Sequence, residues 1–213
     1  MIRANPTQGV KGYSKKTDGW LAWTEVNITQ FKDTHAIGTS QRLAFDLLLG
    51  TGQRRSDVVR LGWQHINGNR LKFKQLKTGA RIEIPIDPAL WISIKSMPKR
   101  NLTFLVTGRG LPFTANGFGN FFRAACNRAG LSNLSAHGLR KAMAVRLAES
   151  GATANQIAAV TGHSSLSEVA RYTAAAEKAL LADQAFRLLS ETNKEQNVSQ
   201  PTAWVGKKLG KNQ

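Results

Sequence analysis

The chain has 213 residues, of which 41% are hydrophobic, so it can bury the core of one ordinary domain, and a fully disordered chain is disfavoured. Lysine and arginine number 30 against 13 acidic residues, which gives a net charge of +17 and an isoelectric point near 10.7. This excess of positive charge favours a polyanionic partner, most simply nucleic acid, although charge alone does not separate DNA from RNA or the ribosome.

Hydropathy and cysteine content favour a location in the cytoplasm. No run is long and apolar enough for a transmembrane helix, and the N-terminus has no apolar signal segment. The single cysteine, Cys126, excludes an internal disulfide and fits a reducing compartment. We expect Cys126 to be a small buried apolar residue on a helix, and we expect no membrane partner.

The predicted elements begin after residues 1–18, which lack an apolar period, contain Asn5-Pro6 and several basic residues, and are expected to be an interdomain linker or arm. Thr24 is a candidate N-cap for a first helix. Thr39 or Ser40 caps a second helix, which ends at 50–52, and a short helix follows over 56–61.

The next segment predicts a β-hairpin. Residues 70–74 and 81–86 alternate apolar and polar side chains around a turn at 77–80, and Pro85 suits a strand end. A helix over 89–96 and a short strand over 104–106 follow.

The C-terminal half predicts helices only. A helix capped by Thr114 runs to about 125, others cover 137–150, 154–160 and 165–172, and a last one covers 174–189. A polar, basic tail occupies 191–213. The fold class is therefore mainly α with a small antiparallel β-sheet (α+β).

Two arginines lie in segments suited to binding a phosphate. Arg54 follows the Thr51-Gly52 turn at a helix start, and Arg140 closes the run His137-Gly138-Leu139-Arg140. The transition state of phosphodiester cleavage spreads negative charge over non-bridging oxygens, and a planar guanidinium donates two hydrogen bonds to such a group. Each arginine taken alone is more often a surface residue; the set makes them candidates.

Two histidines and a lysine are candidates for proton transfer. His137 shares a helical face with Arg140, and His163 follows the helix stop at Gly162, where it can donate to a phosphate oxygen. Lys77 in the hairpin turn can protonate a leaving oxygen, and Lys74 is its nearby competitor.

Tyr172 is the candidate nucleophile, since a phenol forms a covalent intermediate when it is deprotonated on attack. It lies nine residues after His163, and the only other tyrosine, Tyr13, falls in the presumed arm. Asp57 is expected to orient Arg54 or cap its helix rather than act as a base. The few acids form no cluster, so we expect no metal site and no metal-dependent nuclease.

Together these segments resemble the tyrosine recombinase, or phage integrase, family. The family pattern is an Arg after a Thr-Gly-x turn, a Lys in a β-hairpin, a His-x-x-Arg, a Gly-His and then a Tyr. Every member is present in order, and the resemblance runs from about residue 23 to about residue 189. It implies the tyrosine recombinase catalytic-domain fold over residues 19–190.

The resemblance also implies a function, site-specific DNA recombination without cofactor, metal or ATP. Tyr172 would form a 3′-phosphotyrosyl bond, Arg54, Arg140 and His163 would stabilise the phosphate, Lys77 would protonate the leaving oxygen, and His137 would assist proton transfer. The implied partners are double-stranded DNA, at the bacterial nucleoid, and further copies of the chain, as a tetramer on paired sites. The helix from 174 and the tail over 191–213 would dock on a neighbour in trans.

Two alternatives remain open at this point. A type IB topoisomerase shares the residue set and would relax supercoils as a monomer. A non-catalytic DNA-binding derivative of the fold is the other. Relatives usually carry an N-terminal core-binding domain, so the chain is expected to be a fragment or a shortened form, monomeric alone, whose DNA binding is weak, salt-sensitive and mostly nonspecific.

Overall fold

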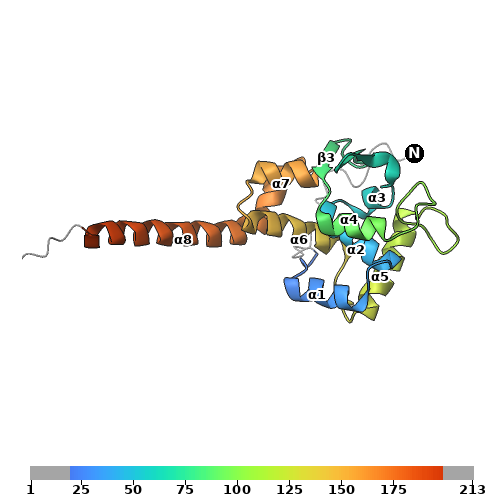
Figure 1. Cartoon of the computed structure of the whole chain (residues 1–213), viewed down its shortest axis with the longest axis horizontal. Helices are drawn as coiled ribbons and strands as arrows, with labels where there is room; N and C mark the ends of the chain where they lie inside the picture. Colours follow the sequence, from blue (N-terminus) through green and yellow to red (C-terminus); the bar gives the residue numbers. More distant parts are fainter. Residues whose placement is uncertain (1–19, 199–213) are drawn as a thin grey trace, which may run out of the picture.

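The structure, a computed structural model, describes residues 20–198, without the side chains of Tyr172 and residues 193–198. A helical body carries a small sheet at its edge, at the top of the view, and the last helix leaves this body as a long rod (Figure 1). The helices are α1 (Glu25–Thr34), α2 (Ser40–Thr51), α3 (Arg55–Val58), α4 (Pro88–Lys95), α5 (Ala115–Arg128), α6 (Ala136–Glu149), α7 (Ala154–Thr161) and α8 (Leu166–Val198). A 3-10 helix covers Trp63–His65, and the strands are β1 (Ile66–Asn67), β2 (Arg70–Lys74) and β3 (Arg81–Pro85).

The predicted fold class is confirmed, since the described residues are mostly helical with one small antiparallel sheet. The predicted hairpin is β2–β3, with Leu71 opposite Ile84, and Pro85 is the last residue of its strand. The short β1 adds a third strand beside β2, in the order β1-β2-β3. Two residues carry too little alternation to be recognised as a strand in the sequence.

Helix boundaries follow the capping signals of the sequence. Thr24, Thr39 and Thr114 are N-caps whose side chains accept from the backbone N–H of the third residue of the helix. α2 and α7 end at Gly52 and Gly162, which have φ of 62° and 72°. These left-handed conformations favour glycine and turn the chain sharply toward the residues that follow.

An aromatic cluster forms the centre of the core and fixes the start of α6. The rings of Trp23, Phe31, Phe45 and Phe122 pack together, with centroid distances of 4.7 to 6.2 Å. Trp23 Nε1 donates to the carbonyl of Ser135, the N-cap of α6, over 2.9 Å. The helix that begins with the sequence Ala-His-Gly is therefore anchored to the core at its first turn.

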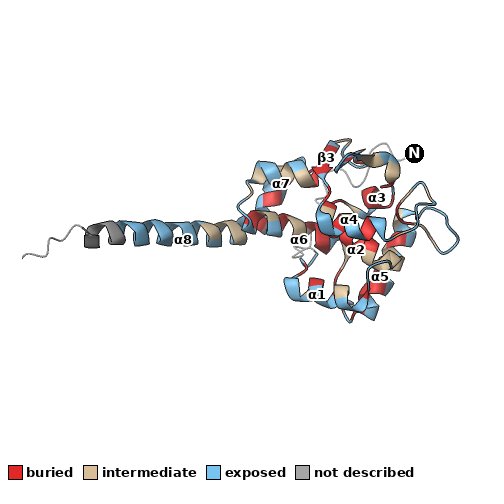
Figure 2. Cartoon of the chain, in the orientation of Figure 1, coloured by how far each residue is buried: buried red, intermediate tan, exposed pale blue. Residues whose placement is uncertain are grey.

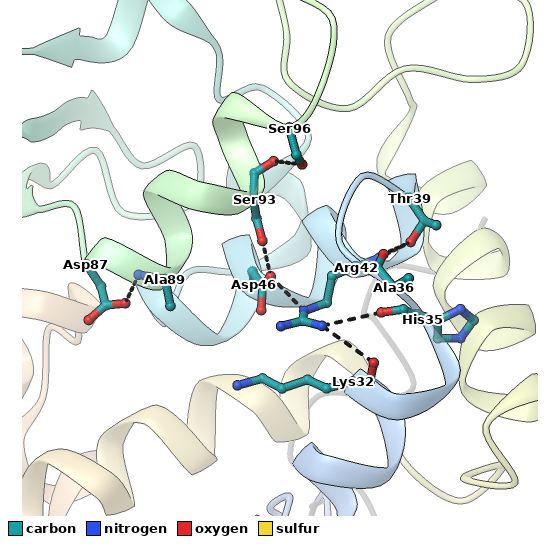
Figure 3. A network of polar contacts seen from close by, with 10 residues as sticks. All are labelled: Lys32, His35, Ala36, Thr39, Arg42, Asp46, Asp87, Ala89, Ser93 and Ser96. Carbon is teal, nitrogen blue, oxygen red and sulfur yellow. Dashed lines mark hydrogen bonds and ion pairs between the residues drawn. The ribbon is translucent and has the colours of Figure 1, made fainter.

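A polar network joins α2 to α4 and to the end of α1 (Figure 3). Arg42 Nε pairs with Asp46 Oδ2 at 2.9 Å, and the Ser93 hydroxyl donates to the same carboxylate oxygen. Arg42 also donates to the carbonyls of Lys32 and His35. The buried Asp46 is thus satisfied by partners on α2 itself and on α4.

Three sequence predictions need correction. The helices expected over 165–172 and 174–189 form one continuous helix, α8, which also includes 191–198 of the expected tail. No glycine or proline interrupts residues 166–198, and alanine, leucine, glutamate and lysine all favour the helix. The strand expected over 104–106 is only an isolated bridge between Val106 and Pro112.

Some predictions fall outside the described residues, namely the linker over 1–18 and the rest of the basic tail, 199–213. Within 20–198, no helix is both long and apolar enough to cross a membrane. Cys126 is buried on α5, as predicted, and burial raises the pKa of its thiol to about 12.

Candidate active site

Arg54 stands at the junction between α2 and α3. α2 ends at Gly52, and Arg54 is the N-cap residue of α3, with an extended backbone. Its side chain is half-buried, and Nη1 donates to the side-chain oxygen of Gln75 over 3.1 Å. The turn therefore directs this guanidinium toward the residue that follows β2.

Arg140 is the largest fully buried side chain of the protein's described part, with 1% of its surface exposed. Its Nη1 donates to the carbonyls of Gly52 and Thr161, over 2.9 and 2.6 Å. Gly52 and Thr161 lie at the C-terminal ends of α2 and α7. Because a helix C-terminus carries partial negative charge, two helix ends stabilise one buried cation.

His163 and His137 lie near both arginines, and the pKa of each imidazole is lowered. Burial is the main cause at His163, followed by the charges of Arg140 and Arg54, and its pKa falls to about 4. Burial also leads at His137, where Arg140, Lys141 and Arg54 lower the pKa further and Glu168 opposes them. Both rings are therefore expected to be neutral at pH 7.

The Thr161 hydroxyl controls which nitrogen of His163 carries the proton. Its oxygen lies 2.7 Å from Nδ1 of His163 and 2.7 Å from the carbonyl of Ile157. The hydroxyl has one proton, so while it donates to Ile157, Nδ1 of a neutral ring is the protonated nitrogen. If the hydroxyl turns toward Nδ1, the proton moves to Nε2, which can then donate to a phosphate oxygen.

The hairpin turn carries Lys77 at the exposed edge of the site. Lys77 lies between β2 and β3, and both it and Lys74, its competitor at the end of β2, are exposed. Asp57 holds this turn, because its Oδ1 accepts from the backbone N–H of Leu76 over 2.7 Å. Asp57 was expected to orient Arg54 or to cap its helix; within 20–198 its carboxylate makes neither contact.

Tyr172 is the one candidate whose place in the site is not described. Its backbone belongs to α8, nine residues after His163, whereas its side chain lies outside the described part of the structure. The structure thus brings together Arg54, Arg140, His137 and His163 and sets Lys77 at the edge.

Sequence reasoning missed the polar residues that join these candidates. Gln75, Gln53 and Thr161 are all buried, and Gln75 Nε2 donates to Gln53 Oε1 and to the Thr161 carbonyl. One signal existed, because Gln75 continues the inward positions of Leu71 and Phe73 along β2. A polar residue at an inward position indicates a buried hydrogen-bonding role.

A pocket of about 440 Å³ adjoins the site between α3, α5 and the start of α6. Arg54 and His137 line it together with two more arginines, Arg55 and Arg123, and the indole of Trp20. Among the residues described, no group of three or more histidine, cysteine or acidic side chains is placed to hold a metal ion.

Comparison with known proteins identifies the family. The family model described as the phage integrase family matches residues 23–179. The shufflon-specific DNA recombinase of Escherichia coli is 30% identical over 132 residues, covering 61% of this chain and 33% of the relative. The integrase of Escherichia phage HK022 is 35% identical over 100 residues, covering 43% of this chain and 28% of the relative. The chain thus spans about a third of the length of these curated relatives.

Solved structures share the fold. A lambda integrase dimer bound to a COC′ core site superposes with a TM-score of 0.67 at 22% identity, covering 81% of this chain and 53% of that one. The lambda integrase catalytic core gives a TM-score of 0.54 at 26% identity, covering 64% of this chain and 91% of that one. The chain therefore belongs to the phage integrase family and has the fold of a tyrosine recombinase catalytic domain.

Proposed function

We propose that this chain, through a catalytic domain over residues 19–190, cuts and rejoins double-stranded DNA at specific sites by way of a phosphotyrosyl link to Tyr172. The observation that carries the proposal is the junction where α2 and α7 end against Arg140, with Arg54 and His163 beside it. Membership of the phage integrase family supports it, because the family model matches residues 23–179, which lie within this domain. The proposed location of the reaction is the cytoplasm.

The arginines supply the electrostatic part of the mechanism. The scissile phosphate gains negative charge on its non-bridging oxygens as the phenol attacks. Arg140 is fixed by two carbonyls and Arg54 by Gln75 before any DNA arrives, so little reorganisation is needed at the moment of reaction. His163 adds a hydrogen bond from Nε2 once the Thr161 hydroxyl has turned toward Nδ1.

Proton transfer balances the covalent step. The Tyr172 oxygen forms a bond to phosphorus, and the bond from phosphorus to the 5′ oxygen breaks. The phenol proton passes to neutral His137, and the exposed ammonium of Lys77 protonates the departing 5′ oxygen. Attack by another strand's 5′-hydroxyl reverses these steps and exchanges the strands, with the bond energy kept in the phosphotyrosyl ester.

Covalent trapping tests the proposal. The chain is incubated with a pool of duplexes whose core sequence is randomised. Each duplex carries a nick, so that the short strand next to the nick diffuses away after cleavage and the covalent product accumulates. The products are separated on a denaturing gel. We expect a protein–DNA band with the wild type and with Tyr13→Phe, the matched control, and no band with Tyr172→Phe. A band that survives Tyr172→Phe would refute the nucleophile.

Each of the two alternatives has its own distinguishing result, one in the trapping experiment and one in a separate plasmid assay. DNA retained without any covalent band would favour a non-catalytic DNA-binding protein. Efficient relaxation of supercoiled plasmid without paired sites would favour topoisomerase-like activity.

We also propose that α8 docks on a second copy of the chain when several copies assemble on paired DNA sites. Every residue from 181 to 192 is exposed along the part of α8 that leaves the body, as Figure 2 shows. Leu181, Phe186, Leu188 and Leu189 are each more than half exposed there, which is unusual for large apolar side chains without a partner. Phe186→Ser should reduce the assembly of multi-copy complexes on DNA in sedimentation, whereas Arg187→Ser should not.

A further inference from the structure

We infer that Gln75 is a positioning residue, whose carboxamide fixes the Arg54 guanidinium and ties it to the turns that carry Lys77 and His163. The inference rests on the proposed function, because it concerns how the residues of that site are held in place.

All four hydrogen-bonding positions of the Gln75 carboxamide are used. Oε1 accepts from Arg54 Nη1 at 3.1 Å and from Thr78 Oγ1 at 2.6 Å. Nε2 donates to Gln53 Oε1 at 2.5 Å and to the Thr161 carbonyl at 2.8 Å. A primary amide offers two acceptor lone pairs and two donor protons, so this side chain is fully satisfied while only 1% of Gln75 is exposed.

The chemistry of the partners determines which end of the amide faces which. Arg54 can only donate and the Thr161 carbonyl can only accept, so a flipped amide would oppose donor to donor and acceptor to acceptor. In a buried site each such mismatch costs about 1–3 kcal/mol. The two hydrogen bonds that Nε2 donates therefore keep the side-chain oxygen of Gln75 directed toward Arg54.

Gln75 also connects the two arginines. Its Nε2 and Arg140 Nη1 share the Thr161 carbonyl as acceptor, so three hydrogen bonds lead from Arg54 through Gln75 and Thr161 to Arg140. Two guanidinium groups on separate helices thereby acquire a defined relative position, which two cations would not adopt through their own repulsion.

Gln75 also contacts the hairpin turn that carries Lys77 and the turn at Gly162 that precedes His163. In the hairpin, the backbone of Gln75 bonds to Gly79 and Ala80, and its side chain bonds to Thr78, the neighbour of Lys77. On the other side, Gly162 approaches so closely that an added Cβ would overlap the Gln75 carboxamide. A change at position 75 must therefore reach both Lys77 and His163.

The first test measures Arg54 directly and needs no activity. Gln75→Met preserves side-chain length and apolar volume but can hold none of these partners well. The heteronuclear NOE of the Arg54 Nε–H, measured on the DNA-free protein, should fall to the value of a mobile side chain, while that of Arg140 stays rigid. Ser93→Ala, which removes a buried hydrogen bond elsewhere, should leave Arg54 unchanged. An unchanged Arg54 NOE in Gln75→Met would overturn the inference.

The second test measures cleavage of the nicked duplex pool in a single turnover. Gln75→Met should lower the rate at saturating DNA by about 100-fold, the cost of misplacing a catalytic group by about 1 Å, with little change in the DNA concentration at half-saturation. Gln75→Glu should lose as much, because its carboxylate opposes the Thr161 carbonyl. A rate within twofold of the wild type in both would also overturn the inference.

A variant that fails to fold and an inactive wild type each leave a measurement that decides the role of Gln75. If Gln75→Met fails to fold, the exposed Thr78→Val variant removes one contact to Oε1 and should slow cleavage about tenfold, the equivalent of one neutral hydrogen bond; a wild-type rate there would count against the inference. If the wild type forms no covalent product, the proposed function fails, and the Arg54 relaxation measurement alone decides the role of Gln75.

Discussion

Gln75 Nε2 and Arg140 Nη1 donate to one acceptor, the carbonyl oxygen of Thr161, over 2.8 and 2.6 Å. Thr161 is the last residue of α7, and its carbonyl has no partner further along the helix. The end of a helix thus supplies the acceptor that a buried cation and a buried amide both need. The chain must turn immediately after Thr161, and it does so through the left-handed conformation of Gly162.

Replacing Gly162 with alanine should destabilise the protein by two separate effects. The left-handed conformation at φ 72° costs a residue with a side chain about 1–2 kcal/mol. The new Cβ would also overlap the Gln75 carboxamide, which is buried and cannot move without breaking its bonds. Urea unfolding should therefore show a loss clearly above 2 kcal/mol.

Gly68→Ala is the matched control for this variant. Gly68 has φ 59°, and nothing lies within 4 Å of an added Cβ. Only the conformational cost of about 1–2 kcal/mol applies there. Equal losses for the two variants would mean that the contact between Gly162 and Gln75 contributes nothing.

Asp57→Ala should loosen the hairpin turn. The Leu76 N–H would lose its acceptor, and because Leu76 is itself exposed, water can replace that acceptor in part, so the loss should be about 1 kcal/mol. Amide hydrogen exchange at Leu76 should accelerate accordingly, since local opening becomes easier. Asp87→Ala, which removes the N-cap of α4, should cost about 1 kcal/mol without changing exchange at Leu76. Unchanged Leu76 exchange in Asp57→Ala would show that the carboxylate does not hold the turn.

Local signals in the sequence predicted most of the fold. Threonine caps and glycine stops mark the starts of α1, α2 and α5 and the ends of α2 and α7, because each acts through its immediate neighbours. Alternation over 70–86 predicted the hairpin for the same reason. The predicted break between Tyr172 and Ala174 is wrong, because no helix-breaking residue lies there and α8 runs through it.

The candidate site was only partly predictable. The motif pattern identified Arg54, Arg140 and His163 as candidates, and the structure places them together. It could not identify the Gly52 and Thr161 carbonyls as the acceptors of Arg140, since backbone carbonyls leave no mark in a sequence and these are 109 positions apart, by 161 − 52. Asp57 was assigned to Arg54 because the two are neighbours in sequence, whereas the fold brings Leu76 to it from β2.

Stability should fall in mild acid because of His163. An unfolded histidine titrates near pH 6.5, whereas the folded pKa is about 4, lowered by burial and by Arg140 and Arg54. Between these values the unfolded state binds more protons, so the stabilising contribution is complete above about pH 6.5 and is lost as the pH falls toward 4.

The measurement compares urea unfolding of the wild type and His163→Gln at pH 7 and pH 5. The variant should lose less stability between the two pH values, and the remaining loss reflects other groups, including His137, whose pKa is also lowered. Parallel losses in the two proteins would mean that His163 is solvated and titrates normally.

Arg55 and Arg123 should contribute to DNA binding through phosphate contacts. Both side chains are exposed and line the pocket of about 440 Å³ beside Arg54 and His137. Each phosphate contact releases counterions, so replacing either arginine with alanine should reduce the slope of log affinity against log salt by about 1. The effect should be equal for all DNA sequences, since a phosphate contact carries no sequence information. Lys32→Ala is the control and should leave the slope unchanged, because Lys32 lies on α1 and lines a different pocket together with Asp46. If all three variants and the wild type have the same slope, Arg55 and Arg123 contact no phosphate and the DNA does not pass over this pocket.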